Sequence, residues 1–273
     1  FWYVEIAKAN ALEGDTVFGL TKFSDMEPET LFAPTSTYDL PECNWGASQL
    51  TSTKDLNKLS DRLDWRDKGA IRPVQNQREC KGCWAFVTVG AIESMAAITL
   101  NISKTLSVQQ VLECVTGSNI SNGCNLGNFA KALNYLNGTK LGIVSDTEYP
   151  LTLRNDTCKK TTGGISLIDF RIGCNITDEN EILYALNDGP LIVRINGGPL
   201  MNYLGGIIKR ACAKSDKNFH DLLLVGYDRK ADIPYYIAKN SWGEDYGENG
   251  YVKMAIYKNI CGVADEVGFV EVK

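Results

Sequence analysis

Hydrophobic residues dominate the stretch from Cys83 to Leu100, CWAFVTVGAIESMAAITL, and fall on nearly every side of a helical projection. A helix that is apolar all round lies inside a protein rather than on its surface. The pattern therefore predicts a helix buried through the middle of a domain. Cys83 would be its first residue, where the positive end of the helix dipole favours a thiolate.

Two shorter helices are predicted over residues 107–114 and 128–136, with Gly, Asn and Ser in the loops between them. After about residue 165 the pattern changes to short β-rich runs, each bounded by Gly, Asp or Pro. These runs are Pro190–Ile195, Asp221–Tyr227, Tyr235–Lys239 and Tyr251–Ile256. A helical first half followed by an antiparallel β second half predicts an α+β protein of two lobes.

The net charge of −5 is concentrated in residues 1–58. Nine of the 33 acidic residues lie there with only four of the 28 basic ones, so 24 of each remain in the neutral main body. Residues 33–58 combine prolines with many Ser, Thr and Asn, and predict an extended connector.

The acidic balance disfavours a nucleic-acid partner, and the chain has no apolar run long enough to cross a membrane. Because the chain begins at Phe1, we expect it to be a fragment whose upstream part, including any signal peptide, has been removed.

The chain has nine cysteines and a single histidine. One C-x-x-C pair (Cys80 and Cys83) without a second pair does not make a zinc site, so we expect neither a metal nor another cofactor. Five N-x-S/T sequons predict a chain that visits the secretory pathway: Asn101, Asn119, Asn137, Asn155 and Asn175. Disulfides are then possible, and an odd count leaves at least one free thiol. The simplest structural interpretation is four bridges and one spare buried cysteine.

Three segments together indicate a catalytic centre. Gln77 lies six residues before Cys83 in QNQRECKGCWAF, His220 follows Cys83 by 137 residues, and Asn240 follows it by 157 in KNSWGEDYGENGY. Each residue alone has a plain structural explanation, because a lone cysteine is usually a small buried hydrophobe. In combination they match a cysteine nucleophile with distant His and Asn partners.

These segments resemble the papain-like cysteine peptidases of the cathepsin type, and the resemblance covers almost the whole chain. LSVQQVLEC resembles the family's next helix, NGCNLG its substrate-facing loop, HDLLLVGYD its histidine strand and RLDWRDKGAIRPV a mature N-terminus. GLTKFSD at residues 19–25 resembles a motif of the inhibitory prosegment, and Ile6 and Asn10 match the tail of the prosegment helix motif.

The resemblance implies a two-lobed papain-like fold with an active site in the cleft between a helical lobe and an antiparallel, β-barrel-like lobe. Residues 1–58 would be a partial inhibitory prosegment and linker, 59–168 the mainly helical lobe with the nucleophile, and 169–273 the mainly β lobe with His and Asn. Cleavage is expected near Lys58–Ser60. Prosegment carboxylates, including Asp25, would lose their pairings as pH falls and release the segment.

The resemblance also implies each residue's role. Cys83 and His220 would form a thiolate–imidazolium pair, and Asn240 would orient the imidazole. The Gln77 amide and the Cys83 backbone N–H would form the oxyanion hole. Trp242 would shield the His–Asn hydrogen bond from water. The implied disulfides are Cys80–Cys124, Cys114–Cys158 and Cys212–Cys261, which leave Cys83 free. Cys43 and Cys174 have no counterpart in the family, and are either free or paired with each other.

Several substrate-cleft positions depart from the family pattern. Lys81 and Leu126 replace glycines, whereas Gly127, whose backbone would pair with substrate, is kept. Asp221 and Arg194 stand where small apolar residues are usual, Glu266 lies near the floor of the S2 subsite, and Phe129 could supply an apolar side. We therefore expect a charged S2 subsite that accepts polar or charged P2 side chains. The alternative is that these long side chains point to solvent.

The sequence thus predicts a secreted or lysosomal cysteine endopeptidase made as an inactive proenzyme. Its partners would be polypeptide substrates, its own prosegment and cystatin-like inhibitors, and it would act as a monomer. Two alternatives remain open: a catalytically silent homologue that acts as a binding or decoy protein, and a thiol oxidoreductase that uses Cys80 and Cys83.

Overall fold

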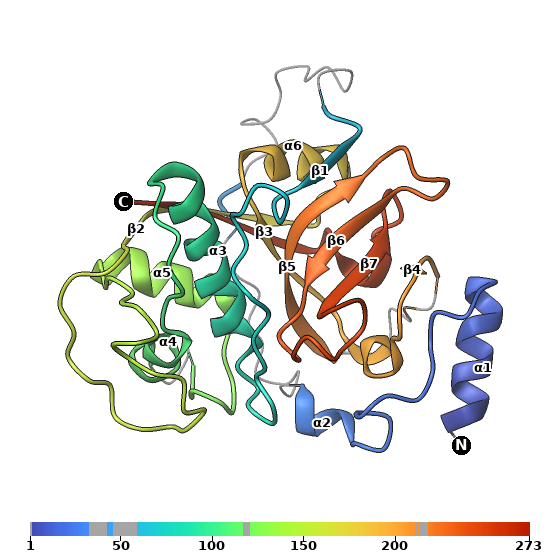
Figure 1. Ribbon diagram of the computed structural model, residues 1–273, viewed down its shortest axis with the longest axis horizontal. Helices are drawn as coiled ribbons and strands as arrows, with labels where there is room; N and C mark the ends of the chain where they lie inside the picture. Colours follow the sequence, from blue (N-terminus) through green and yellow to red (C-terminus); the bar gives the residue numbers. More distant parts are fainter. Residues whose placement is uncertain (1, 33–42, 46–58, 117–120, 211, 213–217) are drawn as a thin grey trace.

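The computed structural model describes residues 2–32, 43–45, 59–116, 121–210, 212 and 218–273. The helices between residues 83 and 139 lie on one side of the molecule and most of the sheet on the other, where the leading helices also lie (Figure 1). The helices are α1 (Trp2–Glu13), α2 (Pro28–Leu31), α3 (Cys83–Thr99), α4 (Val108–Cys114), α5 (Phe129–Thr139) and α6 (Asn180–Asp188). The two-lobed α+β fold is confirmed.

The strands are β1 (Arg62–Asp64), β2 (Leu167–Cys174), β3 (Leu191–Asn196), β4 (Ile207–Ile208), β5 (Phe219–Asp228), β6 (Tyr235–Lys239), β7 (Tyr251–Ala255) and β8 (Glu266–Val272). They form one eight-stranded sheet in the order β2-β8-β3-β5-β6-β7-β4, with β1 paired to β5. The pairs are antiparallel except β4 with β7, which is parallel, so the sheet is mixed rather than wholly antiparallel. Strand β8 runs behind α3 toward β2 and joins the two lobes (Figure 1).

Helix α3 is buried as its composition predicts, and only its first residue and its last turn reach the surface. The shorter helices begin at polar caps: the Ser107 hydroxyl accepts a hydrogen bond from Gln110 N, and the Asn128 side chain accepts one from Lys131 N. Such caps satisfy backbone N–H groups that have no partner inside a helix. Gly127, just before α5, is packed so closely against the Trp84 indole that a Cβ atom would overlap the ring.

The leading segment packs against the β lobe, where α1 and α2 lie beside the strands (Figure 1). Phe18 forms a β-bridge with Tyr203, and Gly19 N donates to Asn202 O at 2.8 Å. The buried Glu13 carboxylate accepts hydrogen bonds from the backbone N–H groups of Lys209 and Arg210, both at 2.8 Å. The segment is therefore a docked part of the molecule.

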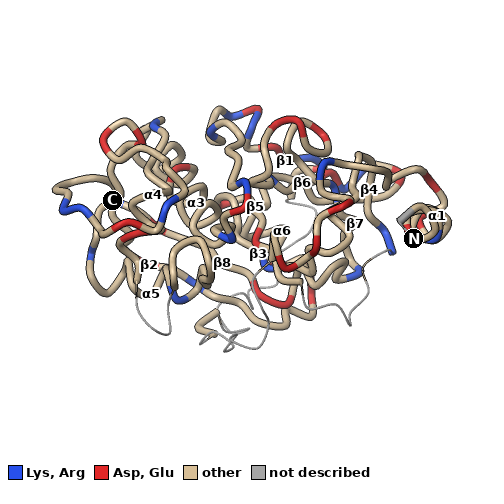
Figure 2. Tube along the Cα trace, turned by 90° about the horizontal axis from the view of Figure 1, so that it is seen from below, with Lys and Arg blue, Asp and Glu red and all other residues tan. Residues whose placement is uncertain are grey.

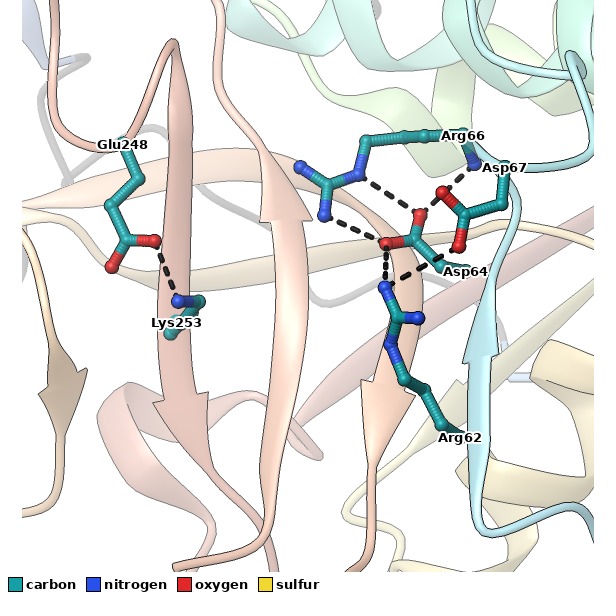
Figure 3. A network of polar contacts seen from close by, with 6 residues as sticks. All are labelled: Arg62, Asp64, Arg66, Asp67, Glu248 and Lys253. Atoms are coloured by element: carbon teal, nitrogen blue, oxygen red, sulfur yellow. Dashed lines mark hydrogen bonds and ion pairs between the residues drawn. The ribbon is translucent and has the colours of Figure 1, made fainter. Parts of the chain in front are cut away.

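Basic and acidic residues both occur in each lobe (Figure 2). No helix among the described residues is long and apolar enough to cross a membrane. At the end of β1, Asp64 is held by Arg66 at 2.7 Å and by Arg62 at 3.3 Å (Figure 3). This network fixes the chain just after residue 59.

We expect Asp64→Asn to destabilise the protein at pH 7. Burial raises the pKa of Asp64, but hydrogen bonds from Arg66 and the charges of Arg66 and Arg62 outweigh it, so the pKa lies below 3.8. A carboxyl group whose pKa is lower in the folded than in the unfolded protein stabilises the fold at pH values above its unfolded-state pKa. This stabilisation is lost as the pH falls through its folded-state pKa. Urea unfolding from pH 7 to pH 2 should therefore show the gap between wild type and variant closing in acid. A gap independent of pH would contradict this role.

Candidate active site

Cys83 is the first residue of α3 and is partly exposed. It is the free cysteine, because the other eight form Cys43–Cys174, Cys80–Cys124, Cys114–Cys158 and Cys212–Cys261. The last three pairings are those that the resemblance implied, and the first answers the open question about Cys43 and Cys174. Because Cys80 is bonded to Cys124, the thiol-oxidoreductase alternative has no Cys80–Cys83 dithiol to use.

His220 lies near the start of β5, and Asn240 follows the end of β6, the next strand in the sheet. Both side chains are buried, and His220 Nε2 lies 2.7 Å from Asn240 Oδ1. The Trp242 ring covers the imidazole, with centroids 4.6 Å apart. The antiparallel pairing of β5 with β6 thus brings together three residues separated by up to 22 positions in the chain.

Gln77 is buried beside the Cys80–Cys124 bridge. Its Nε2 donates to Cys80 O at 2.7 Å, and its Oε1 accepts from Ser241 Oγ at 2.6 Å. A side-chain amide nitrogen carries two hydrogens, and this bond to Cys80 uses one of them. The amide is therefore fixed in place with donor capacity to spare.

The charged residues expected at S2 do not point to solvent. Arg194 Nε and Nη2 donate to the two Asp221 oxygens at 2.7 and 2.9 Å, and all but a few per cent of both side chains is buried. Glu266 Oε2 lies 3.9 Å from Arg194 Nη1, and the guanidinium lies 5.5 Å from the centre of the buried Phe129 ring. Asp221 Oδ2 is also 4.0 Å from Cys83 Sγ. The solvent-pointing alternative is wrong for these three residues.

The ion pair follows from strand register. Arg194 on β3 and Asp221 on β5 are directly opposed partners of an antiparallel pair. Opposed side chains in such a pair lie close enough to interact. Sequence reasoning placed both residues near S2 but did not pair them, since the register depends on the folded sheet.

Burial controls the ionisation of the two candidate catalytic groups. Burial, and then the nearby Asp221 carboxylate, raise the pKa of the Cys83 thiol to about 12, although Arg194 acts in the opposite direction. Burial lowers the pKa of His220 below 6.5, despite the hydrogen bond to Asn240. In this form of the protein both groups are therefore neutral at pH 7.

The leading segment covers this centre. The Phe32 ring meets His220 edge-on, with centroids 6.0 Å apart, and Phe23 packs on Trp242 at 4.9 Å. Lys22 Nζ forms an ion pair with Asp245 at 2.6 Å. Phe23 belongs to the predicted GLTKFSD motif, whereas Phe32 lies outside the motif and was not predicted.

The expectation about Asp25 needs correction. Asp25 is exposed and has no side-chain hydrogen bond or ion pair within the described residues. The carboxylates that hold the leading segment are Glu13, which accepts two backbone hydrogen bonds, and Asp245 of the β lobe.

The remaining predicted positions are partly exposed or lie on the surface. Lys81 and Leu126 are partly exposed, and Lys81 N donates to Cys124 O at 2.8 Å. Of the sequons, Asn101, Asn155 and Asn175 are exposed and Asn137 is partly exposed, while Asn119 lies outside the described residues. No group of three His, Cys, Asp or Glu side chains in the described part of the chain could hold a metal ion.

Comparisons with known proteins agree with this geometry. The family described as papain family cysteine protease matches residues 59–270. Cathepsin O of Homo sapiens is 37% identical over 266 residues, covering 94% of this chain and 81% of that protein. Cathepsin O of Mus musculus is 41% identical over 213 residues, or 77% of this chain and 67% of the relative.

Solved structures give the same result. Digestive procathepsin L 3 of Tenebrio molitor superposes with a TM-score of 0.79 at 28% identity, over 99% of this chain and 88% of that one. The bromelain protease of Ananas comosus in complex with the E64 inhibitor superposes with a TM-score of 0.71 at 30% identity, over 79% of this chain and all of that one. The chain belongs to the papain family of cysteine proteases.

Proposed function

We propose that this chain is the proenzyme of a cysteine endopeptidase whose nucleophile is Cys83. One arrangement carries the proposal: the free cysteine begins a buried helix and faces the β lobe where His220 is held by Asn240. A nearby base and the N-terminus of a helix each favour the thiolate that acts as the nucleophile at neutral pH. Cys83 stands at the N-terminus of α3, and its Sγ lies 4.0 Å from Oδ2 of Asp221, the residue next to His220.

The reaction follows from these positions. Removal of the leading segment admits water and substrate, so the burial that keeps Cys83 and His220 neutral is relieved, and the proton moves from sulfur to the imidazole. The thiolate attacks the scissile carbonyl, while the Gln77 amide and the Cys83 backbone N–H stabilise the oxyanion. His220 then protonates the leaving amine and afterwards activates water to hydrolyse the thioester.

The enzyme would act in the lysosome or outside the cell. Five sequons and four disulfides suit a lysosomal or secreted protein. Its partners would be polypeptide substrates, its own prosegment and cystatin-like inhibitors, and it would act as a monomer. Residues 1–58 would be the prosegment, with the helical lobe to residue 168 and the β lobe beyond it.

The test is hydrolysis of a quenched fluorescent peptide by protein processed in acid. We expect turnover by the wild type and none by the Cys83→Ala variant cut by the active enzyme. A catalytically silent decoy would remain inactive after complete removal of the prosegment, and that result would overturn the proposal.

We predict that Asp245→Asn shifts conversion of the zymogen to a higher pH. Hydrogen bonding from Lys22 lowers the pKa of Asp245. The ion pair is therefore fully formed at any pH above the ordinary pKa of an aspartate, and it is lost as the pH falls through the lowered pKa of Asp245. Without the carboxylate the prosegment loses this contact at every pH. A gel series from pH 7 to pH 4 measures conversion. Lys22→Ala should shift it at least as far, because it also removes the hydrogen bond from Lys22 Nζ to Trp242 O at 3.1 Å, and the double variant should shift it no further than Lys22→Ala. If the shifts of the two single variants add up in the double variant, the Lys22–Asp245 ion pair is not the contact that controls conversion.

We also propose that Arg194, Asp221 and Glu266 make S2 selective for polar or charged P2 side chains. The three charged side chains lie together, and Asp221 Oδ2 is 4.0 Å from Cys83 Sγ. A peptide library varied at P2 should show this preference, and Arg194→Leu/Asp221→Ala should move it toward Leu and Phe. A wild-type profile dominated by Leu and Phe would contradict the assignment.

A further inference from the structure

Residues 43–45 are docked on strand β2 of the enzyme body. Cys43 is bonded to Cys174, the last residue of β2, with the two Cα atoms 5.9 Å apart. Asn44 N donates to Ile172 O at 3.0 Å, and the Asn44 side chain accepts from Ile172 N at 2.6 Å and donates to Phe170 O at 3.2 Å. The short segment is therefore fixed to β2 by one disulfide and by hydrogen bonds to Phe170 and Ile172.

An aromatic side chain completes this contact. Trp45 is 7% exposed, and its backbone N donates to Ile172 O at 2.8 Å. The indole lies over Gly173, where an added Cβ would come within 3.3 Å of the ring, and the Arg171 guanidinium lies 5.5 Å from the ring centre. In the sheet β2 pairs with β8, and its other edge is where Asn44 and Trp45 bind. An open sheet edge is a ready site for an added peptide.

This docked segment lies on the prosegment side of the expected processing site. The family match begins at residue 59, and the expected cut is near Lys58–Ser60. The covalent bond at Cys43 would therefore survive that cut, since it joins the upstream piece to a strand of the enzyme body.

We infer that the edge of β2 is a permanent binding surface for the peptide around Cys43–Trp45, so that the processed protease is a two-chain enzyme joined by the Cys43–Cys174 disulfide. The inference rests on the proposed function only for the processing event. Hydrolysis near Lys58–Ser60 breaks one peptide bond with one water, and leaves the disulfide untouched.

The Cys43–Cys174 disulfide would act as a tether that keeps the prosegment attached during activation. After the first cut the inhibitory contacts of Phe23 and Phe32 remain on the same chain as Cys43. A tethered inhibitor acts at an effective concentration of the order of millimolar, far above that of a dissociated one. Full activity then requires a second cut between Phe32 and Cys43, after which only the peptide on β2 stays bound.

The experiment uses full-length zymogen carrying Cys83→Ala, cut in trans by a trace of active enzyme, and intact-mass analysis before and after dithiothreitol. We expect the non-reduced product to include the mass of a peptide containing Cys43 and Trp45, and reduction to release it. The Cys43→Ser/Cys174→Ser variant should lose the peptide without reductant. If that variant fails to fold, a non-reducing peptide map of the wild type gives the same information. A processed enzyme that lacks the peptide, with Cys174 alkylated as a free thiol, would overturn the inference.

The time course of activity tests separately whether the Cys43–Cys174 tether delays activation. In non-reducing buffer the wild type should gain activity after a lag that follows the second cut, whereas Cys43→Ser/Cys174→Ser should gain it with the first. Equal time courses would contradict the tether's role in activation. If no protein hydrolyses peptide at all, the proposed function fails, while the mass analysis of the Cys83→Ala protein cut by any other protease still decides the inference.

Discussion

The Cys83→Ala variant is expected to lose peptide hydrolysis by about 10⁴- to 10⁶-fold, the scale seen when a hydrolase loses its nucleophile. Cys83 is the one thiol outside the four disulfides, so no other described cysteine can replace it. Removing one sulfur atom at the partly exposed start of α3 leaves the buried face of the helix intact. The loss should therefore appear in kcat, with thermal stability close to that of the wild type.

The matched control is Cys83→Ser, which keeps a hydroxyl of similar size at the same place. A serine in this site lacks the low pKa and nucleophilicity of a thiolate, so the variant should be almost as inactive. Residual activity within tenfold of the wild type in either variant would show that another group performs the chemistry.

The second large effect is expected from Arg194→Leu. Removing one partner of a buried ion pair typically costs about 3–5 kcal/mol, because the remaining charge stays buried without its counterion. Here two carboxylates, Asp221 and Glu266, lose the cation that lies between them. For a protein of this size the melting temperature should fall by roughly 10 °C.

Two controls distinguish the ion pair from general damage. Arg194→Leu/Asp221→Ala should recover part of the stability, since it removes the charge that lost its partner. Lys230→Leu breaks an exposed pair with Asp61 and should cost less than about 1 kcal/mol. Calorimetry that shows equal losses for Arg194→Leu and Lys230→Leu would contradict the importance of the buried pair.

Much of this fold could be predicted from local pattern. Helix α3 was expected over 83–100 and is found at Cys83–Thr99, and β6 has the predicted bounds Tyr235–Lys239. Strands β2 and β8 were not predicted. Strand β2 mixes charged and apolar residues without clear alternation. Helix α6 carried a signal, since Ile182, Leu183 and Leu186 have helical spacing, but it lies within a β-rich stretch.

Side-chain partners across the fold could be predicted less well. The sequence indicated Cys83, His220, Asn240 and Gln77 as members of one centre, because their order along the chain is characteristic of the family. It did not indicate that Arg194 pairs with Asp221, which depends on the register of β3 with β5. It also did not decide between free and paired Cys43 and Cys174, which are 131 residues apart and meet only in the folded protein.

The central claim is that removing the prosegment converts Cys83 from a neutral thiol into a reactive thiolate. It can be tested by labelling with an epoxide that alkylates active-site thiols, followed by peptide mass spectrometry, on the zymogen and the acid-processed protein at pH 6. We predict one label on Cys83 of the processed protein, and at least about a hundredfold slower labelling of the zymogen, where burial raises the pKa of this thiol to about 12. Labelling at equal rates in both forms, or no label on Cys83 after complete processing, would contradict the claim.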